Sequence, residues 1–193
     1  MKIIKLFLIA LSMLTRIKLP VNLDYSEQNM KNSVVFYPTV GLLIGLIMYL
    51  LALIFSLINL NILIVSFIIL FLPFFINNFF HFDGLCDVLD AFFAFKTKDK
   101  RLEIMKDPHI GSFALGYIFF FLLLKFIIVY IFFSKKLDLT YLIIIPLFSR
   151  FVILLLAYRS FYPRESGTAK IIVGKIPFFT LFISFLTLVI SIL

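Results

Sequence analysis

The stretch that decides the fold is Asn77–Asp107, which reads NNFFHFDGLCDVLDAFFAFKTKDKRLEIMKD. It holds six of the ten acidic residues and lies between long apolar runs. A helix over Gly84–Ala94 would place Asp83, Asp87 and Asp90 within an arc of about 60° on one face. Like charges arranged in this way repel one another and are costly to desolvate at a membrane edge. We therefore expect a bound cation there, and Mg²⁺ or Mn²⁺ is the kind of hard ion that prefers carboxylate oxygens.

The composition excludes a soluble domain, because the mean hydropathy is +1.16 and only 15% of the residues are charged. The single cysteine, Cys86, excludes an intrachain disulfide framework and a Cys-rich zinc site. The net charge of +8 gathers at the ends of apolar runs, which favours membrane topology over nucleic-acid binding as its cause. We predict an all-α, polytopic membrane helix bundle with a cytoplasmic Asp-rich helix or loop, forming one integral membrane domain over residues 1–193.

Four apolar runs are predicted to span the membrane: Val34–Ile58, Ile62–Phe80, Ser112–Phe133 and Leu139–Ala157. Pro73 is expected to kink the second span or to mark its break. In the first span, Gly41 and Gly45 form a GxxxG pattern that allows close helix contact. An internal packing contact is the favoured interpretation of this pattern, and a dimer face is the alternative.

The flanking segments are shorter or more polar. Ile3–Leu14 is too short for a span and is predicted to be an interfacial or half-inserted helix, with a signal peptide as the alternative. Ile17–Ser33 is predicted to be loop-like, with Ser26 as a candidate helix cap. Ile176–Leu193 begins a further apolar helix.

The distribution of positive charge predicts the orientation. With four spans, the loops on the side of Ile17–Ser33 carry twelve Lys and Arg residues, whereas the opposite loops carry two, Lys135 and Lys136. The positive-inside rule makes the first side cytoplasmic. We therefore expect a multi-pass protein of the cell membrane whose acidic stretch faces the cytoplasm.

Several further residues are candidates for the site. Arg150 lies within a predicted span, close to its cytoplasmic end, and could reach the acidic stretch or an anionic substrate. Lys125, near the middle of another span, is expected to snorkel or to pair with a polar group. His81, two positions before Asp83, is a candidate proton carrier or ligand-orienting residue, with a hydrogen-bonded structural role as the alternative.

A second group of charged residues follows the acidic stretch. Glu103 and Asp107 are four residues apart and could form another carboxylate pair beside Lys106. A solvated face is the alternative for them and the favoured interpretation for Asp99. The loop Arg159–Lys175 is basic and includes Arg159 and Arg164, which could hold a phosphate opposite an acidic metal site. Carboxylates, a metal and basic groups together indicate phosphoryl or pyrophosphate chemistry by a membrane-bound transferase.

Five segments carry a resemblance to a known family: LTRIKLP (Leu14–Pro20), FYPTVGLLIG (Phe36–Gly45), HFDGLCDVLDAF (His81–Phe92), RLEIMKDPHIGSFALG (Arg101–Gly116) and PLFSR (Pro146–Arg150). The sequence resembles the cobalamin synthase, or adenosylcobinamide-GDP ribazoletransferase, family. The order of the segments is that of the family, and the HxDGLxDxxDA pattern followed by EIMKDxxIGxxG is specific.

The resemblance implies a reaction in which adenosylcobinamide-GDP and α-ribazole, or its 5′-phosphate, give adenosylcobalamin, or its 5′-phosphate, with release of GMP. It implies Mg²⁺ as the cofactor and these two molecules and the lipid bilayer as partners, without nucleic acid, and it leaves open a homo-oligomer. The metal and diphosphate residues of the family correspond to Asp83, Asp87 and Asp90, with Glu103, Lys106 and Asp107 in the second block. Asp83, His81 and Arg150 are the candidate catalytic residues, and Lys106, Arg159 and Arg164 are the candidate binding residues for the substrate.

Members of this family are usually longer and carry a glycine-rich GDxxGA-type motif near the C-terminus, which this sequence does not contain. We therefore expect a chain truncated relative to the family, which folds around its central spans and is weakly active or inactive alone. The alternatives are another Mg²⁺-dependent membrane phospho- or prenyltransferase and, from a different class, a cation transporter. Transporter sites tend to lie at mid-bilayer on broken helices, whereas these carboxylates are expected at the cytoplasmic edge.

Overall fold

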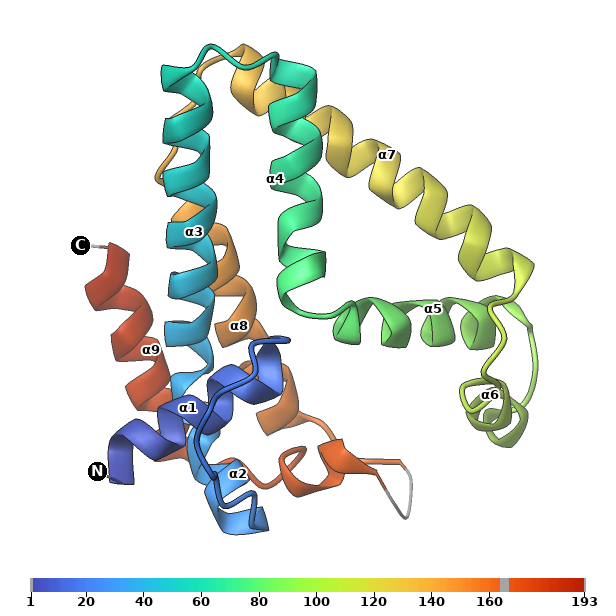
Figure 1. The fold of residues 1–193 in the computed structure, drawn as a ribbon. Helices are drawn as coiled ribbons and strands as arrows, with labels where there is room; N and C mark the ends of the chain where they lie inside the picture. The colour runs from blue at the N-terminus through green and yellow to red at the C-terminus, as the bar shows by residue number, and fades with distance from the viewer. Residues whose placement is uncertain (1, 164–166, 193) are drawn as a thin grey trace. The chain divides into compact units, whose positions relative to one another are not determined.

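The computed structural model describes residues 2–163 and 167–192, and within these ranges the chain is all-α (Figure 1). Nine α-helices and two short 3₁₀ helices follow one another, and no strand occurs in the described part. Their bounds are α1 Lys2–Leu14, α2 Glu27–Ser33, η1 Val34–Phe36, α3 Tyr37–Leu57, α4 Ile62–Ile76, α5 Phe80–Phe93, α6 Lys98–Ile104, α7 Ser112–Ser134, α8 Tyr141–Arg159, η2 Thr168–Ile171 and α9 Phe178–Ile192.

Three helical segments are long and apolar enough to cross a membrane: Glu27–Leu57, Ser112–Ser134 and Tyr141–Arg159. A fourth crossing is counted only if α4 and the helix after it form one broken span, because they are bent by 92° relative to each other. The shorter apolar helix Phe178–Ser191 lies within α9. The predicted spans around α3, α7 and α8 are therefore confirmed as apolar helices of spanning length.

The chain divides into two compact units, residues 1–56 with 138–193 and residues 57–137. In the first unit, α3 packs against α8 at two glycines. A Cβ atom at Gly41 would lie 2.5 Å from the carbonyl oxygen of Pro146, and one at Gly45 would lie 2.6 Å from the Cα atom of Ile143. Each glycine therefore allows a backbone-to-backbone contact that no other residue could make. The favoured interpretation of GxxxG as an internal contact is confirmed.

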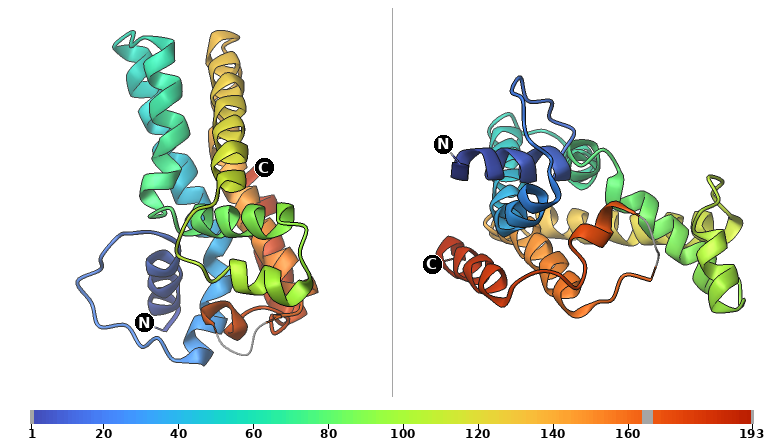
Figure 2. Two further views of the ribbon diagram at one scale, coloured as in Figure 1. Left: turned by 90° about the vertical axis from the view of Figure 1, so that its right-hand side faces the viewer. Right: turned by 90° about the horizontal axis from the view of Figure 1, so that it is seen from below.

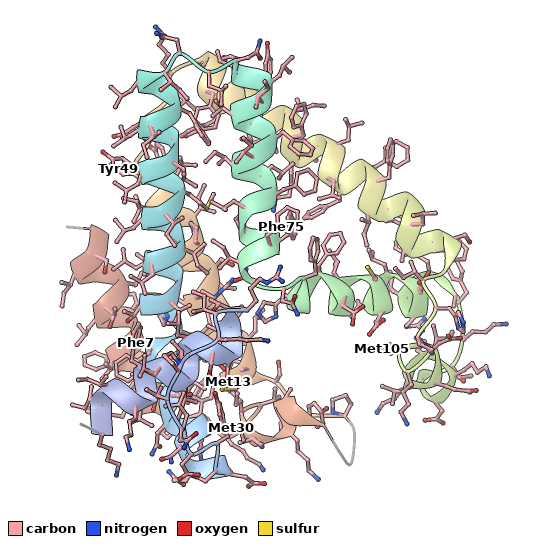
Figure 3. The ribbon with its side chains drawn as sticks, viewed as in Figure 1. Phe7, Met13, Met30, Tyr49, Phe75 and Met105 are labelled. Carbon is pink, nitrogen blue, oxygen red and sulfur yellow. The ribbon has the colours of Figure 1, made fainter. Side chains whose placement is uncertain are left out.

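The same unit contains the helices near both ends of the sequence. Helix α1 buries Ile9, Ala10 and Leu14, whereas Ile3 and Ile4 are exposed. Met13 of α1 and Met30 of α2 are labelled in Figure 3, and the Ser33 hydroxyl contacts both residues, donating to the Met30 carbonyl oxygen at 2.7 Å. Helix α9 lies beside α8 (Figure 2, right).

The start of the first span differs from the prediction. Residues Glu27–Ser33 were expected in a loop, but they form α2, which continues through η1 into α3. Ser26 occupies the N-cap position of α2 as predicted, although its side chain makes no capping hydrogen bond. The apolar run alone predicts a start at Val34 because the polar residues of α2 carry no membrane signal.

In the second unit, α4 begins after Asn61, whose side chain accepts a hydrogen bond from the backbone N–H of Leu63 at 2.9 Å. Pro73 lies inside α4, which continues to Ile76. The break comes at Asn78 and Phe79, which both adopt left-handed backbone conformations with φ of 52° and 56°. The predicted span Ile62–Phe80 is therefore wrong in its last residues, since the chain turns through a right angle before Phe80.

Candidate functional site

Helix α5 has an apolar face that packs on α7. Phe82, Cys86 and Leu89 recur at helical spacing and contact Ala114 and Ile118 at the start of α7. The ring of Phe93, one turn after Leu89, stacks on Tyr117 with a centroid separation of 4.1 Å and an interplanar angle of 11°. These contacts turn the apolar face of α5 toward α7.

Asp83 and Asp87 lie one turn apart on the other side of α5. Asp83 is exposed, Asp87 is half-buried, and Gly84 between them has open space where a Cβ atom would be. Figure 3 shows oxygen-bearing side chains along the lower side of the α5 ribbon. The prediction that Asp83, Asp87 and Asp90 share one helical face is confirmed, because α5 is helical over Phe80–Phe93.

Asp90 shares this face, but its carboxylate is hydrogen-bonded to a neighbouring helix. Its carboxylate accepts the backbone N–H of Gly111 at 2.7 Å and that of Ala114 at 2.9 Å. Gly111 is the N-cap residue of α7 and Ala114 lies in its first turn. One oxygen of Asp90 serves each donor, so this carboxylate is engaged by the end of a neighbouring helix.

The carboxylates of α5 offer the oxygen ligands that a Mg²⁺ site requires. Among residues 2–163 and 167–192, no three His, Cys, Asp or Glu side chains form a group that could hold a metal ion. A protein Mg²⁺ site needs fewer, because Mg²⁺ is commonly held by one or two carboxylates, with water and substrate phosphates completing the octahedron. Asp83 and Asp87 fit that smaller requirement. His81 lies in the first turn of α5, and its side chain is exposed.

The second block of predicted residues lies in and after α6 of the same unit. Glu103 pairs with Lys100 at 2.8 Å, and both side chains are exposed. Asp107 accepts hydrogen bonds from the backbone N–H of His109 at 2.9 Å and contacts its ring nitrogen at 2.7 Å. These hydrogen bonds lower the pKa of the Asp107 carboxyl, and the one from the backbone N–H of His109 has the largest effect. Lys106 is exposed next to this turn.

Arg150 is in the first unit, at the middle of α8 and not near its cytoplasmic end as expected. Its side chain is 7% exposed, and its Nε atom has no hydrogen-bond partner. Arg150 interacts electrostatically with Tyr37, which is also buried and lies one turn before Gly41 in α3. The close approach of α3 and α8 at the glycines explains why a guanidinium in this position is enclosed.

The remaining predicted binding residues lie at the end of α8 and after it. Arg159 is the last residue of α8 and is exposed. Arg164 lies outside the described residues. Gly111 was predicted to lie in a turn ahead of the next span, and it is the N-cap residue of α7. Tyr37 was missed at the sequence level, and its place inside the quoted FYPTVGLLIG segment was the available signal.

Comparison with known proteins agrees with these segments. Residues 6–193 match the profile of the family described as cobalamin-5-phosphate synthase. The chain belongs to this family. Within the cobalamin-5-phosphate synthase family, the matched region includes every described helix of this chain except the first residues of α1. No solved structure matches the chain.

Curated relatives within the cobalamin-5-phosphate synthase family carry the name adenosylcobinamide-GDP ribazoletransferase. The relative from Clostridioides difficile is 36% identical over 89% of the present chain. The relative from Alkaliphilus oremlandii is 34% identical over 84% of the present chain, and the one from Fusobacterium nucleatum is 32% identical over 88% of it. The present chain covers 66%, 64% and 64% of these three proteins, respectively. The chain thus spans less than two thirds of the length of these relatives.

Proposed function

We propose that this chain takes part in the transfer of the phosphocobinamide group of adenosylcobinamide-GDP to α-ribazole or its 5′-phosphate, with release of GMP. The supporting observation is the presentation of Asp83 and Asp87 one turn apart on α5, directly after the right-angle break that follows an apolar helix. This arrangement holds two carboxylates just beyond the end of the apolar helix α4. It suits one substrate that carries a diphosphate and another that carries a hydroxyl nucleophile.

In the proposed reaction, a ribose hydroxyl oxygen of the ribazole other than the 5′ oxygen, which carries the phosphate in the 5′-phosphate substrate, attacks the phosphorus attached to the cobinamide. The bond from that phosphorus to the bridging oxygen of the diphosphate breaks, and GMP leaves with the bridging oxygen. The proton of the hydroxyl passes to a base on α5, for which Asp83 and His81 are the candidates. Mg²⁺, when bound, would neutralise charge on the diphosphate oxygens.

Two residues of α5 and one residue that follows α6 would bind the metal and the diphosphate. Asp83 and Asp87 would hold Mg²⁺, because their oxygens are hard ligands and the exposed side of the helix leaves room for a substrate phosphate. Lys106, exposed after α6, would contribute positive charge toward the diphosphate. The roles predicted for Arg150 and Arg159 remain predictions, since both residues belong to the other unit.

The test is GMP release from adenosylcobinamide-GDP with α-ribazole and Mg²⁺, using the chain in lipid vesicles. The 193-residue chain would be compared with a form extended by the C-terminal segment of the Clostridioides difficile relative. Asp83→Asn and Asp87→Asn should lower turnover by orders of magnitude in whichever form is active and should respond to added Mn²⁺. Asp99→Asn, on exposed α6, is the matched control and should leave turnover unchanged. No GMP from either form, or full turnover in both α5 variants, would refute the proposal.

A second candidate function has one observation in its favour. The 92° break between α4 and α5 is a feature shared with the discontinuous helices of transporters. Mg²⁺ flux into vesicles, measured with the same protein and without nucleotide, separates the two functions. Flux that Asp83→Asn abolishes, without GMP release, would favour the transporter.

A further inference from the structure

Asp90 supplies the N-terminal cap of α7 from another helix. The first N–H groups of an α-helix have no intrahelical acceptor and need a partner. In α7 the N-cap residue is a glycine, which has no side chain to provide one. The two oxygens of Asp90 accept the N–H groups of Gly111 and Ala114, at 2.7 and 2.9 Å. These are the two donors that a capping box satisfies with two separate side chains.

Both the negative charge of Asp90 and the small size of Gly111 suit this contact. A carboxylate at a helix N-terminus interacts favourably with the partial positive charge there. A Cβ atom at Gly111 would lie 2.5 Å from Oδ1 of Asp90, so a larger residue would displace the carboxylate. Asp90 and Gly111 therefore form one unit, which we name the α5–α7 clasp.

The clasp lies at the edge of the packed face of α5. The Cys86, Ala114 and Ile118 core lies on one side of it along α5, and the stacked Phe93 and Tyr117 rings lie on the other. Apolar packing alone resists rotation of α5 weakly, because hydrophobic contacts are non-directional. Two directed hydrogen bonds to fixed backbone donors set the rotation. They thereby set the side on which Asp83 and Asp87 stand.

We propose that Asp90 is a positioning residue that locks the rotation of α5 against α7 and is not a ligand of the metal. The clasp itself is independent of the proposed function, whereas the statement about the metal rests on it. An experiment with two separate readouts keeps these apart. Backbone hydrogen exchange measures the clasp, and Mn²⁺ binding followed by electron paramagnetic resonance measures the metal site.

The exchange readout uses the full chain in lipid and the peptide that contains Gly111 and Ala114. Asp90→Asn presents one acceptor oxygen to two donors and should speed exchange there by about 10- to 100-fold, the range expected for losing a hydrogen bond to a charged acceptor. Gly111→Ala should give the same increase. Asp87→Asn, one turn away on α5, is the control and should leave exchange unchanged. Unchanged exchange in Asp90→Asn would overturn the clasp.

The metal readout has the opposite pattern. Asp83→Asn and Asp87→Asn should weaken Mn²⁺ binding about tenfold or more, whereas Asp90→Asn and Gly111→Ala should change it less than about twofold. In turnover measurements, Asp90→Asn and Gly111→Ala should lower kcat without raising the Mg²⁺ concentration needed for half of the maximal activity. Their double variant should be no worse than either alone, because both break the same contact.

The outcomes distinguish the two ideas. Weaker Mn²⁺ binding in Asp90→Asn, to the extent seen in Asp87→Asn, would make Asp90 a ligand and refute the proposal. Failure of every form to bind Mn²⁺ would count against the proposed function, while faster exchange in Asp90→Asn would still establish the clasp. A purely structural role, in which Asp90→Asn lowers only the thermal stability and leaves kcat unchanged, would also refute positioning.

Discussion

At the residue scale, Lys125 shows how a charge within a span can be accommodated by aromatic rings. Its ammonium lies 5.4 Å from the ring centroid of Phe74 in α4 and 5.3 Å from that of Phe121 in α7. The sequence predicts snorkelling or a polar partner, and the structure provides aromatic faces. A cation over an aromatic ring is attracted to the negative face of that ring.

A double-mutant cycle tests this contact. Lys125→Met and Phe121→Leu should show a coupling free energy of about 0.5–2 kcal/mol in thermal unfolding, because each removes one partner of the same attraction. Lys125→Met alone should retain turnover. The matched control is Phe120→Leu, one position along α7 and without a described contact to Lys125. Zero coupling between Lys125 and Phe121 would refute the contact.

At the element scale, α3 packs closely on α8 because Gly41 and Gly45 have only a hydrogen atom where other residues have a side chain. Gly41→Ala would place a methyl group 2.5 Å from the Pro146 carbonyl oxygen, against a backbone that cannot rotate away. We expect this variant to lose about 1–3 kcal/mol of stability, as overpacked cores do. Thermal unfolding in detergent measures it.

Gly116→Ala provides the matched control for this packing, because nothing lies within 4 Å of the added methyl group on α7. It should be neutral or stabilise by up to about 1 kcal/mol, since alanine favours helix over glycine. Equal stability of the Gly41→Ala and Gly116→Ala variants would contradict the close helix contact.

The elements also show where sequence reasoning succeeds. Long apolar runs with charged or polar ends predict α7 and α8 within a few residues, because only a helix satisfies its backbone inside a bilayer. The break after α4 could not be placed, since it depends on Phe79 in a left-handed conformation that its residue type disfavours. The cap from Asp90 joins residues 21 positions apart, and periodicity along one helix carries no information about such a contact.

At the scale of the whole molecule, the prediction is topology, and it rests on twelve basic residues in the loops of one side against two in the other. In a Cys86→Ala background, which removes the single native thiol, a cysteine at Lys136 should react with an impermeant reagent added outside spheroplasts. A cysteine at Lys98 should react only after the membrane is opened. The reverse pattern would place α6 and the neighbouring carboxylates outside the cell.

The right-angle break after α4 has a consequence for the lipid. A helix of 15 residues rises about 22 Å, which is less than a hydrocarbon layer of about 30 Å. Because the chain turns away at once, α5 does not lengthen α4, so a crossing by α4 alone would either thin the bilayer around it or draw the carboxylates toward the hydrocarbon. Thinning costs a fraction of a kcal/mol per Å, whereas burying a charge costs several kcal/mol. In such a crossing the membrane would yield first, and its elasticity would set the height at which the carboxylates meet the water.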